Sequence, residues 1–183
     1  IMIGNMVGNS KAAIYSVAYT VASIMTLMIN AINSSFIPSM YQNLDEKKYD
    51  KIEKESFPLC IIIAVAVCGV MLIGPEIIGI LASKEYAEAI YCIPPVAASI
   101  YFTYLYTLFI NVEFYFEKTK YSMIVSVLGA ILNIFLNDLL IPKFGYIAAG
   151  YTTLVCYILF AIGHGCLCAS LKKLSLIHIS EPT

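Results

Sequence analysis

The hydrophobic positions of this chain gather in long stretches, and most charged positions fall in the short segments between them. A helix needs about 20 apolar residues to cross a hydrocarbon core of about 30 Å, and five stretches reach that length. The sequence therefore predicts an all-α fold, a polytopic bundle of about five transmembrane helices. The predicted spans are about 12–40, 57–83, 92–116, 121–141 and 144–171.

Polar residues inside three of these spans recur every three or four positions, which places each set on one face of a helix. Asparagine is costly in lipid unless it finds a partner, so we expect these faces to turn inward. One interpretation is a substrate cavity, and the alternative is that the same residues join helices by packing and hydrogen bonds. The residues that we assign to the cavity are Tyr19, Ser23, Thr26, Asn30, Tyr101, Tyr104, Asn111, Ser126, Asn133 and Asn137.

The ionisable residues of the spans are expected near the membrane surfaces. At a rise of about 1.5 Å per residue, Glu113 and His164 each lie roughly 30 Å along their spans, near the inner surface. Glu76 and Asp138 fall near the outer surface. A charge at the midplane would indicate a relay or an ion site. We expect His164 to be satisfied by a neighbouring helix, and we assign none of these residues a coupling role.

The composition agrees with a lipid environment. The chain of 183 residues is 60% hydrophobic and 13% charged, against about 45–50% and about 25% in soluble domains. Its net charge of −1 offers no basic surface for nucleic acid.

No enzyme signature is present: there is no Ser/His/Asp pattern, no carboxylate pair at metal-binding spacing and no glycine-rich phosphate loop. His164, Cys166 and Cys168 occupy alternate positions, so on a helix Cys166 faces away from the other two. We therefore expect no catalytic residues, no metal, no cofactor and free cysteines.

The lysines predict the orientation. With five spans, one side carries Lys47, Lys48, Lys51, Lys54, Lys118, Lys120, Lys172 and Lys173, and the other carries Lys11, Lys84 and Lys143. Because cytoplasmic loops are enriched in positive charge, the first side is predicted to be cytoplasmic. The connection 41–56 is then a charged cytoplasmic segment, predicted to be a solvated helix with Asp50 and Lys54 paired at i,i+4. The alternative is a plain surface connector.

Several short strings, in this order, resemble a known family. They are FIPS at 36–39, GPEII at 74–78, EYAEA at 85–89, EKTKY at 117–121 and NIFLNDLLIPKFGYIAAGYTTLVCY at 133–157. Together they resemble the C-terminal half of polysaccharide-export flippases. These belong to the superfamily that also contains multidrug and toxic-compound exporters and peptidoglycan-precursor flippases.

The resemblance implies that residues 1–174 are half of a transporter of about 12 to 14 helices in a bacterial cytoplasmic membrane. It implies translocation of lipid-linked oligosaccharide, with membrane lipid, the oligosaccharide and the missing half of the protein as partners. The family's key charged residues are mostly associated with the other half, so none is carried over. Residues 175–183 (SLIHISEPT) look like a translated adapter sequence, and the start at Ile1 looks internal to a longer gene.

Three other functions stay open from the sequence. One is a drug or cation antiporter of the same superfamily. Another is a multi-span membrane enzyme of polysaccharide assembly, against which the short loops argue. The third is a membrane protein without transport, in which the polar faces serve packing alone.

Overall fold

The computed structural model describes residues 1–180, and every regular element within them is a helix. Five helices are long and apolar enough to cross a membrane, which confirms the predicted all-α transmembrane bundle. The elements are α1 (Met2–Val7), α2 (Asn9–Asp45), α3 (Tyr49–Leu81), the 3-10 helix η1 (Lys84–Cys92), α4 (Ile93–Tyr115), α5 (Thr119–Phe144) and α6 (Ile147–Ser180). Residues 181–183 of the presumed non-native tail lie outside the described part, so that assignment stays a prediction.

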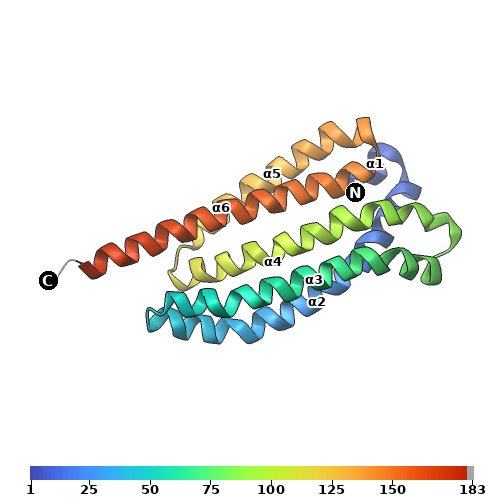
Figure 1. The fold of residues 1–183 in the computed structure, drawn as a ribbon. Helices are drawn as coiled ribbons and strands as arrows, with labels where there is room; N and C mark the ends of the chain where they lie inside the picture. The colour runs from blue at the N-terminus through green and yellow to red at the C-terminus, as the bar shows by residue number, and fades with distance from the viewer. Residues whose placement is uncertain (181–183) are drawn as a thin grey trace.

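The bundle is built around α4. This helix packs against α2 and α3 on one side and against α6 on the other, and α5 packs mainly on α6. Figure 1 shows the α2–α3 turn and the α4–α5 turn at one end of the bundle, with α1, η1 and the α5–α6 junction at the other. The lysines that the sequence assigned to opposite sides therefore lie at opposite ends of the helices.

The charged connection 41–56 is helical on both sides of a short turn. Helix α2 continues to Asp45 and α3 begins at Tyr49, because Asp, Glu and Lys are compatible with a helix and let both helices run past their apolar parts. The reversal takes place at Lys47, whose φ of 56° is left-handed. The N–H of Lys48 then donates to the carbonyl of Asn43 at 2.8 Å, closing the end of α2 as a Schellman motif.

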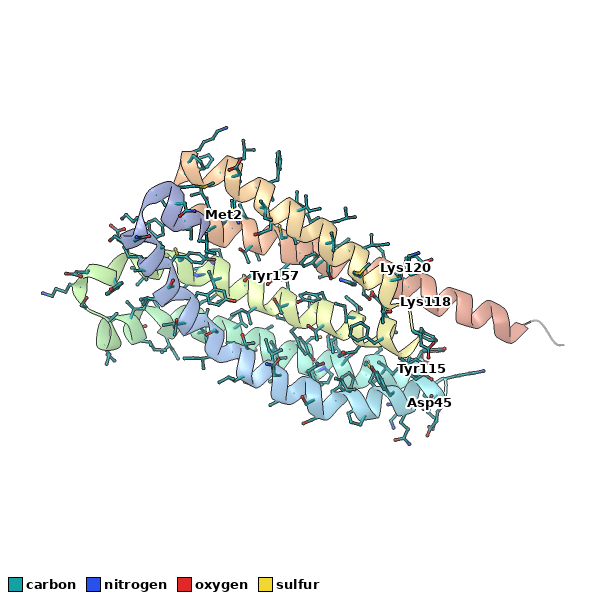
Figure 2. The ribbon with its side chains drawn as sticks, turned by 180° about the vertical axis from the view of Figure 1, so that it is seen from behind. Met2, Asp45, Tyr115, Lys118, Lys120 and Tyr157 are labelled. Atoms are coloured by element: carbon teal, nitrogen blue, oxygen red, sulfur yellow. The ribbon has the colours of Figure 1, made fainter. Side chains whose placement is uncertain are left out.

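The α4–α5 turn repeats this geometry. Glu117 has a φ of 57°, and the N–H of Lys118 donates to the carbonyl of Glu113 at 2.9 Å. The Tyr115 hydroxyl donates a hydrogen bond to the Asp45 carboxylate and so joins the two turns (Figure 2). This hydrogen bond therefore links α2 and α4 at this end of the bundle.

A cluster of polar side chains links three segments at the opposite end of the bundle. Lys11 of α2 forms an ion pair with Glu88 of η1 at 2.6 Å, and its ammonium lies 5.1 Å from the ring centroid of Tyr146. The Tyr146 hydroxyl donates to the same Glu88 carboxylate at 2.9 Å. The cluster thus joins α2, η1 and the α5–α6 junction.

The main apolar core lies between α2, α3 and α4, but much of the apolar surface stays outside it. Residues such as Leu27, Leu72 and Leu128 are 74%, 76% and 61% exposed. A water-soluble domain rarely exposes large apolar side chains so densely. In a bilayer this surface faces lipid tails, so the chain is a multi-pass membrane protein.

Candidate functional site

A cleft of about 490 Å³ opens between α2, α4, α5 and α6. Tyr157 of α6, which is labelled in Figure 2, is one of the residues that line it. The lining combines aromatic rings with hydroxyl and amide groups. The lining residues are Tyr19, Tyr106, Ser126, Gly129, Ala130, Asn133, Thr153, Cys156, Tyr157 and Phe160.

Three of the residues assigned to a cavity from sequence line this cleft: Tyr19 from α2, and Ser126 and Asn133 from α5. Asn137 lies one turn further along α5 and donates its amide N–H to the Asn133 side-chain oxygen at 2.9 Å. Asn137 in turn accepts a hydrogen bond from Thr152 of α6. The polar face of α5 therefore both lines the cleft and holds α6 in place.

The face of α4 that carries Tyr101, Tyr104 and Asn111 packs against neighbouring helices. Tyr104 is fully buried in the core between α2, α3 and α4, and its hydroxyl has no hydrogen-bond partner. Tyr101 packs against the same core. The Asn111 amide donates to the Asn33 side-chain oxygen of α2 at 2.9 Å. These positions correspond to the packing alternative considered for the polar faces.

The remaining assigned residues belong to α2. Ser23 and Thr26 are half-buried, and the Ser23 hydroxyl donates to the carbonyl of Thr20. Asn30 is exposed. None of the three is among the side chains that line the cleft.

Aromatic rings form one wall of the cleft. Tyr106 and Tyr157 stack with their ring centroids 5.8 Å apart and their planes 9° apart, and Phe160 meets Tyr106 edge-on at 5.7 Å. Gly129 of α5 leaves the room that Phe160 occupies, because a Cβ there would lie 1.8 Å from the phenyl ring. Stacked rings beside hydroxyls and amides suit the apolar faces and hydroxyl edges of a sugar.

Directly behind this wall lies a buried acid–base pair. The Nδ1 atom of His164 in α6 is 2.9 Å from Oε1 and 3.1 Å from Oε2 of Glu113 in α4. The Ser122 hydroxyl of α5 donates to the same carboxylate. The two side chains are 1% and 0% exposed, and Nε2 of His164 has no partner.

Two glycines allow α6 to come close at this level. A Cβ on Gly163 would lie 3.3 Å from Val125 of α5, and one on Gly165 would lie 3.3 Å from Phe109 of α4. Such contacts are tighter than side chains normally make, so a side chain at either position would require its neighbour to shift by a few tenths of an ångström. The sequence Gly-His-Gly is thus a packing device that brings His164 to Glu113.

Sequence reasoning did not identify this pair or the rings of Tyr106, Tyr157 and Phe160. His164 was expected to be satisfied by another helix, and its Nδ1 is, but the partner was not named. One signal was available, since Glu113 and His164 have the same estimated depth on the same side of the membrane. Equal depth permits contact, but it does not show that two helices are neighbours.

Within the described residues, no three His, Cys, Asp or Glu side chains are placed to share a metal ion. Cys166 is exposed, whereas the Cys168 thiol of the same helix contacts the carbonyl of Phe109 at 3.7 Å. All six cysteines are free.

No protein-family model matches the chain, and no solved structure matches it. The chain is similar to a curated protein of the archaeon Haloferax volcanii, named as a probable low-salt glycan biosynthesis flippase, Agl15. The two are 22% identical over 167 residues, which cover 89% of this chain and 35% of that protein. The chain therefore spans about a third of the length of its relative. This distant similarity and the apolar helices together fit a membrane transporter of a flippase-like kind.

Proposed function

We propose that this chain is part of a flippase that moves a lipid-linked oligosaccharide across a membrane for surface polysaccharide synthesis. The observation that carries the proposal is the cleft between α2, α4, α5 and α6, lined by tyrosine rings, hydroxyls and an asparagine amide. The similarity to a named glycan flippase supports the same substrate class. A neutral polar cleft in an apolar bundle matches a neutral polar headgroup on an apolar carrier.

In this proposal the sugar headgroup enters the cleft while the lipid tail stays in the bilayer. Tyr106 and Tyr157 stack on sugar faces, and Ser126, Asn133 and Thr153 hydrogen-bond to hydroxyls. The cleft volume of about 490 Å³ falls within the range of about 300–1,000 Å³ typical of small-ligand sites. The cleft therefore holds part of an oligosaccharide rather than a whole chain.

We also propose that residues 1–174 are the C-terminal half of the transporter. Supporting this, the chain aligns to only 35% of its relative, and its large apolar faces leave room for a second helical half. The resemblance implies a bacterial cytoplasmic membrane, whereas the relative is archaeal. The proposed location of the transporter is therefore the cytoplasmic membrane of a prokaryote.

The test replaces side chains that line the cleft in the full-length protein. Ser126→Leu and Tyr157→Leu should each lower surface polysaccharide at least about tenfold, while lipid-linked oligosaccharide accumulates on the inner leaflet. The matched control is Met123→Leu, on the same helix as Ser126 but 60% exposed and outside the cleft. Unchanged surface polysaccharide in both cleft variants, at normal protein levels, would falsify the proposal.

A further inference from the structure

We infer that a second site on this chain, separate from the cleft, binds a phospholipid of the bilayer whose headgroup carries an ammonium, phosphatidylethanolamine. The acyl chain lies in an apolar pocket of about 350 Å³ between α2, α3, α4 and α6, and the headgroup meets Glu53 at its rim. None of the residues that line this pocket lines the cleft. The inference does not depend on the proposed transport function.

The shape of the apolar pocket fits a chain that runs along the helices. The pocket lies at the lysine-rich end of the bundle, beside the turns that hold Asp45 and Lys118 (Figure 2). Along α2 its lining extends from Phe36 to Leu44, which is about 12 Å at the helical rise per residue. Helix α4 forms the floor, because α3 and α6 both pack on α4 and hardly touch each other. The pocket is therefore a groove between α3 and α6.

The groove is hollow because α6 contributes only small side chains to it, namely Gly165, Cys168 and Ala169. The backbone of α6 is already close to α4 here, since a Cβ on Gly165 would lie 3.3 Å from Phe109. The helices therefore cannot approach further to close the space. An empty apolar space forfeits dispersion contacts along its whole lining. Ala169 on its rim is exposed, so a chain of the surrounding bilayer can enter and restore these contacts.

A polar recess adjoins the apolar pocket and shares Glu53 with it. The recess is lined by Asp50, Glu53, Lys54 and Phe57. Because Phe57 begins the predicted span 57–83, the recess lies at the boundary between lipid and water. Two carboxylates and one ammonium suit a zwitterionic head, in which the lipid ammonium donates to Glu53 and the lipid phosphate accepts from Lys54.

Glu53 and Lys54 are available for such a headgroup. Among the side chains that the structure describes, none forms an ion pair with either residue, whereas the neighbouring Lys51 pairs with Glu55 at 3.6 Å. An anionic lipid, or a polyprenyl phosphate carrier, would bring net negative charge to the two carboxylates of the recess and be repelled. The charge at the rim therefore selects a phospholipid with an ammonium over both.

The headgroup is tested by native mass spectrometry of the full-length protein, incubated with equal amounts of dioleoyl phosphatidylethanolamine and dioleoyl phosphatidylglycerol. The wild type should retain the ethanolamine lipid over the glycerol lipid by at least about threefold, as an exposed ion pair allows. Glu53→Gln should bring this ratio close to one. Glu76→Gln, which changes an exposed carboxylate near the other end of α3, should leave the ratio unchanged.

The acyl pocket is tested with a phosphatidylethanolamine that carries a photoreactive diazirine in its acyl chain. In the full-length wild type, labelled peptides should include the pocket residues of α4 and α6. Ala169→Phe places a ring in the pocket and should lose this labelling. The matched control is Ile162→Phe, on the same helix but 56% exposed and outside the pocket, which should keep it.

The wild-type measurements decide the question even if a variant fails to fold. Equal retention of the two lipids overturns the headgroup assignment. Labelling that is as strong on the exposed face of α5, around Leu128, as in the pocket overturns the acyl site. Absence of label from the pocket, as expected if the rest of the full-length protein covers it, overturns the site as well. Displacement of the ethanolamine lipid by undecaprenyl phosphate would assign the pocket to the carrier and contradict the inference.

Discussion

Asn111 of α4 donates a side-chain hydrogen bond to Asn33 of α2 across 2.9 Å, within the largest helix interface on that side of the bundle. Asn111 was assigned to a cavity from the sequence, and Asn33 follows Asn30, another assigned residue, at helical spacing. The structure gives one polar face to packing between α2 and α4 and another, on α5, to the wall of the cleft. The same residue types thus serve two purposes, and experiments can separate them.

The Asn33–Asn111 hydrogen bond should contribute a modest, measurable stability. In a double-mutant cycle with Asn33→Leu and Asn111→Leu, we expect a coupling energy of about 0.6 kcal/mol and at most about 1.7 kcal/mol, as for other interhelical bonds in membranes. The measurement is reversible unfolding of the full-length protein in mixed micelles. Asn30→Leu, an exposed change on α2, is the control and should be close to neutral. A coupling energy of zero would show that the bond adds nothing.

Gly129 should be intolerant of even one added methyl group. Gly129→Ala places a Cβ about where the Phe160 ring now lies, so the ring, which lines the cleft, must move. We expect loss of transport and a lower melting temperature, both partly restored by adding Phe160→Leu. The control is Gly69→Ala on α3, where a Cβ meets nothing within 4 Å and helix propensity favours alanine. Equal tolerance of the two alanines would contradict the packing of Phe160 over Gly129.

The cluster of Lys11, Glu88 and Tyr146 should stabilise its end of the bundle only slightly. Glu88→Ala removes the acceptor of both bonds, but the carboxylate is exposed and screened by solvent, so the expected loss of stability is small. Because salt screens exposed charges, the difference from wild type should shrink as salt is raised. Thermal unfolding at low and high salt measures this. Glu85→Ala, an exposed change on the same 3-10 helix, should have no comparable effect.

The two ends of the bundle should face opposite sides of the membrane. In a cysteine-free version of the full-length protein, Lys118→Cys should react with an impermeant thiol reagent only from the cytoplasmic side. Lys84→Cys should react only from the outside, because the lysine-rich end is predicted to be cytoplasmic. Labelling of intact cells against inverted vesicles checks both. Reaction of the two cysteines from the same side would rule out the five-span topology.

Polar residues on the helix faces could be found from the sequence, but their partners could not. Helical spacing places Asn133 and Asn137 on one side of α5 whatever surrounds that helix. Their actual contacts, with Cys156 and Thr152 of α6, depend on how the two helices are rotated against each other. That rotation is set by close contacts of small residues, such as Gly163 against Val125.

The sequence by itself determined the number of spans, their approximate limits, and the end of the bundle that carries most lysines. Membrane thickness and the need to satisfy every backbone group inside lipid act on each segment separately, so a single segment carries that information. Within 41–56 it predicted helical structure but not the turn at Lys47, because charged residues are compatible with both a helix and a turn.

Only the tertiary structure decided that Glu113 meets His164 and that Tyr106 connects this pair to the cleft. These contacts join residues about fifty positions apart on different helices. They follow from which helices are neighbours and how each is turned, and that is settled by the packing of the whole bundle rather than by any one span.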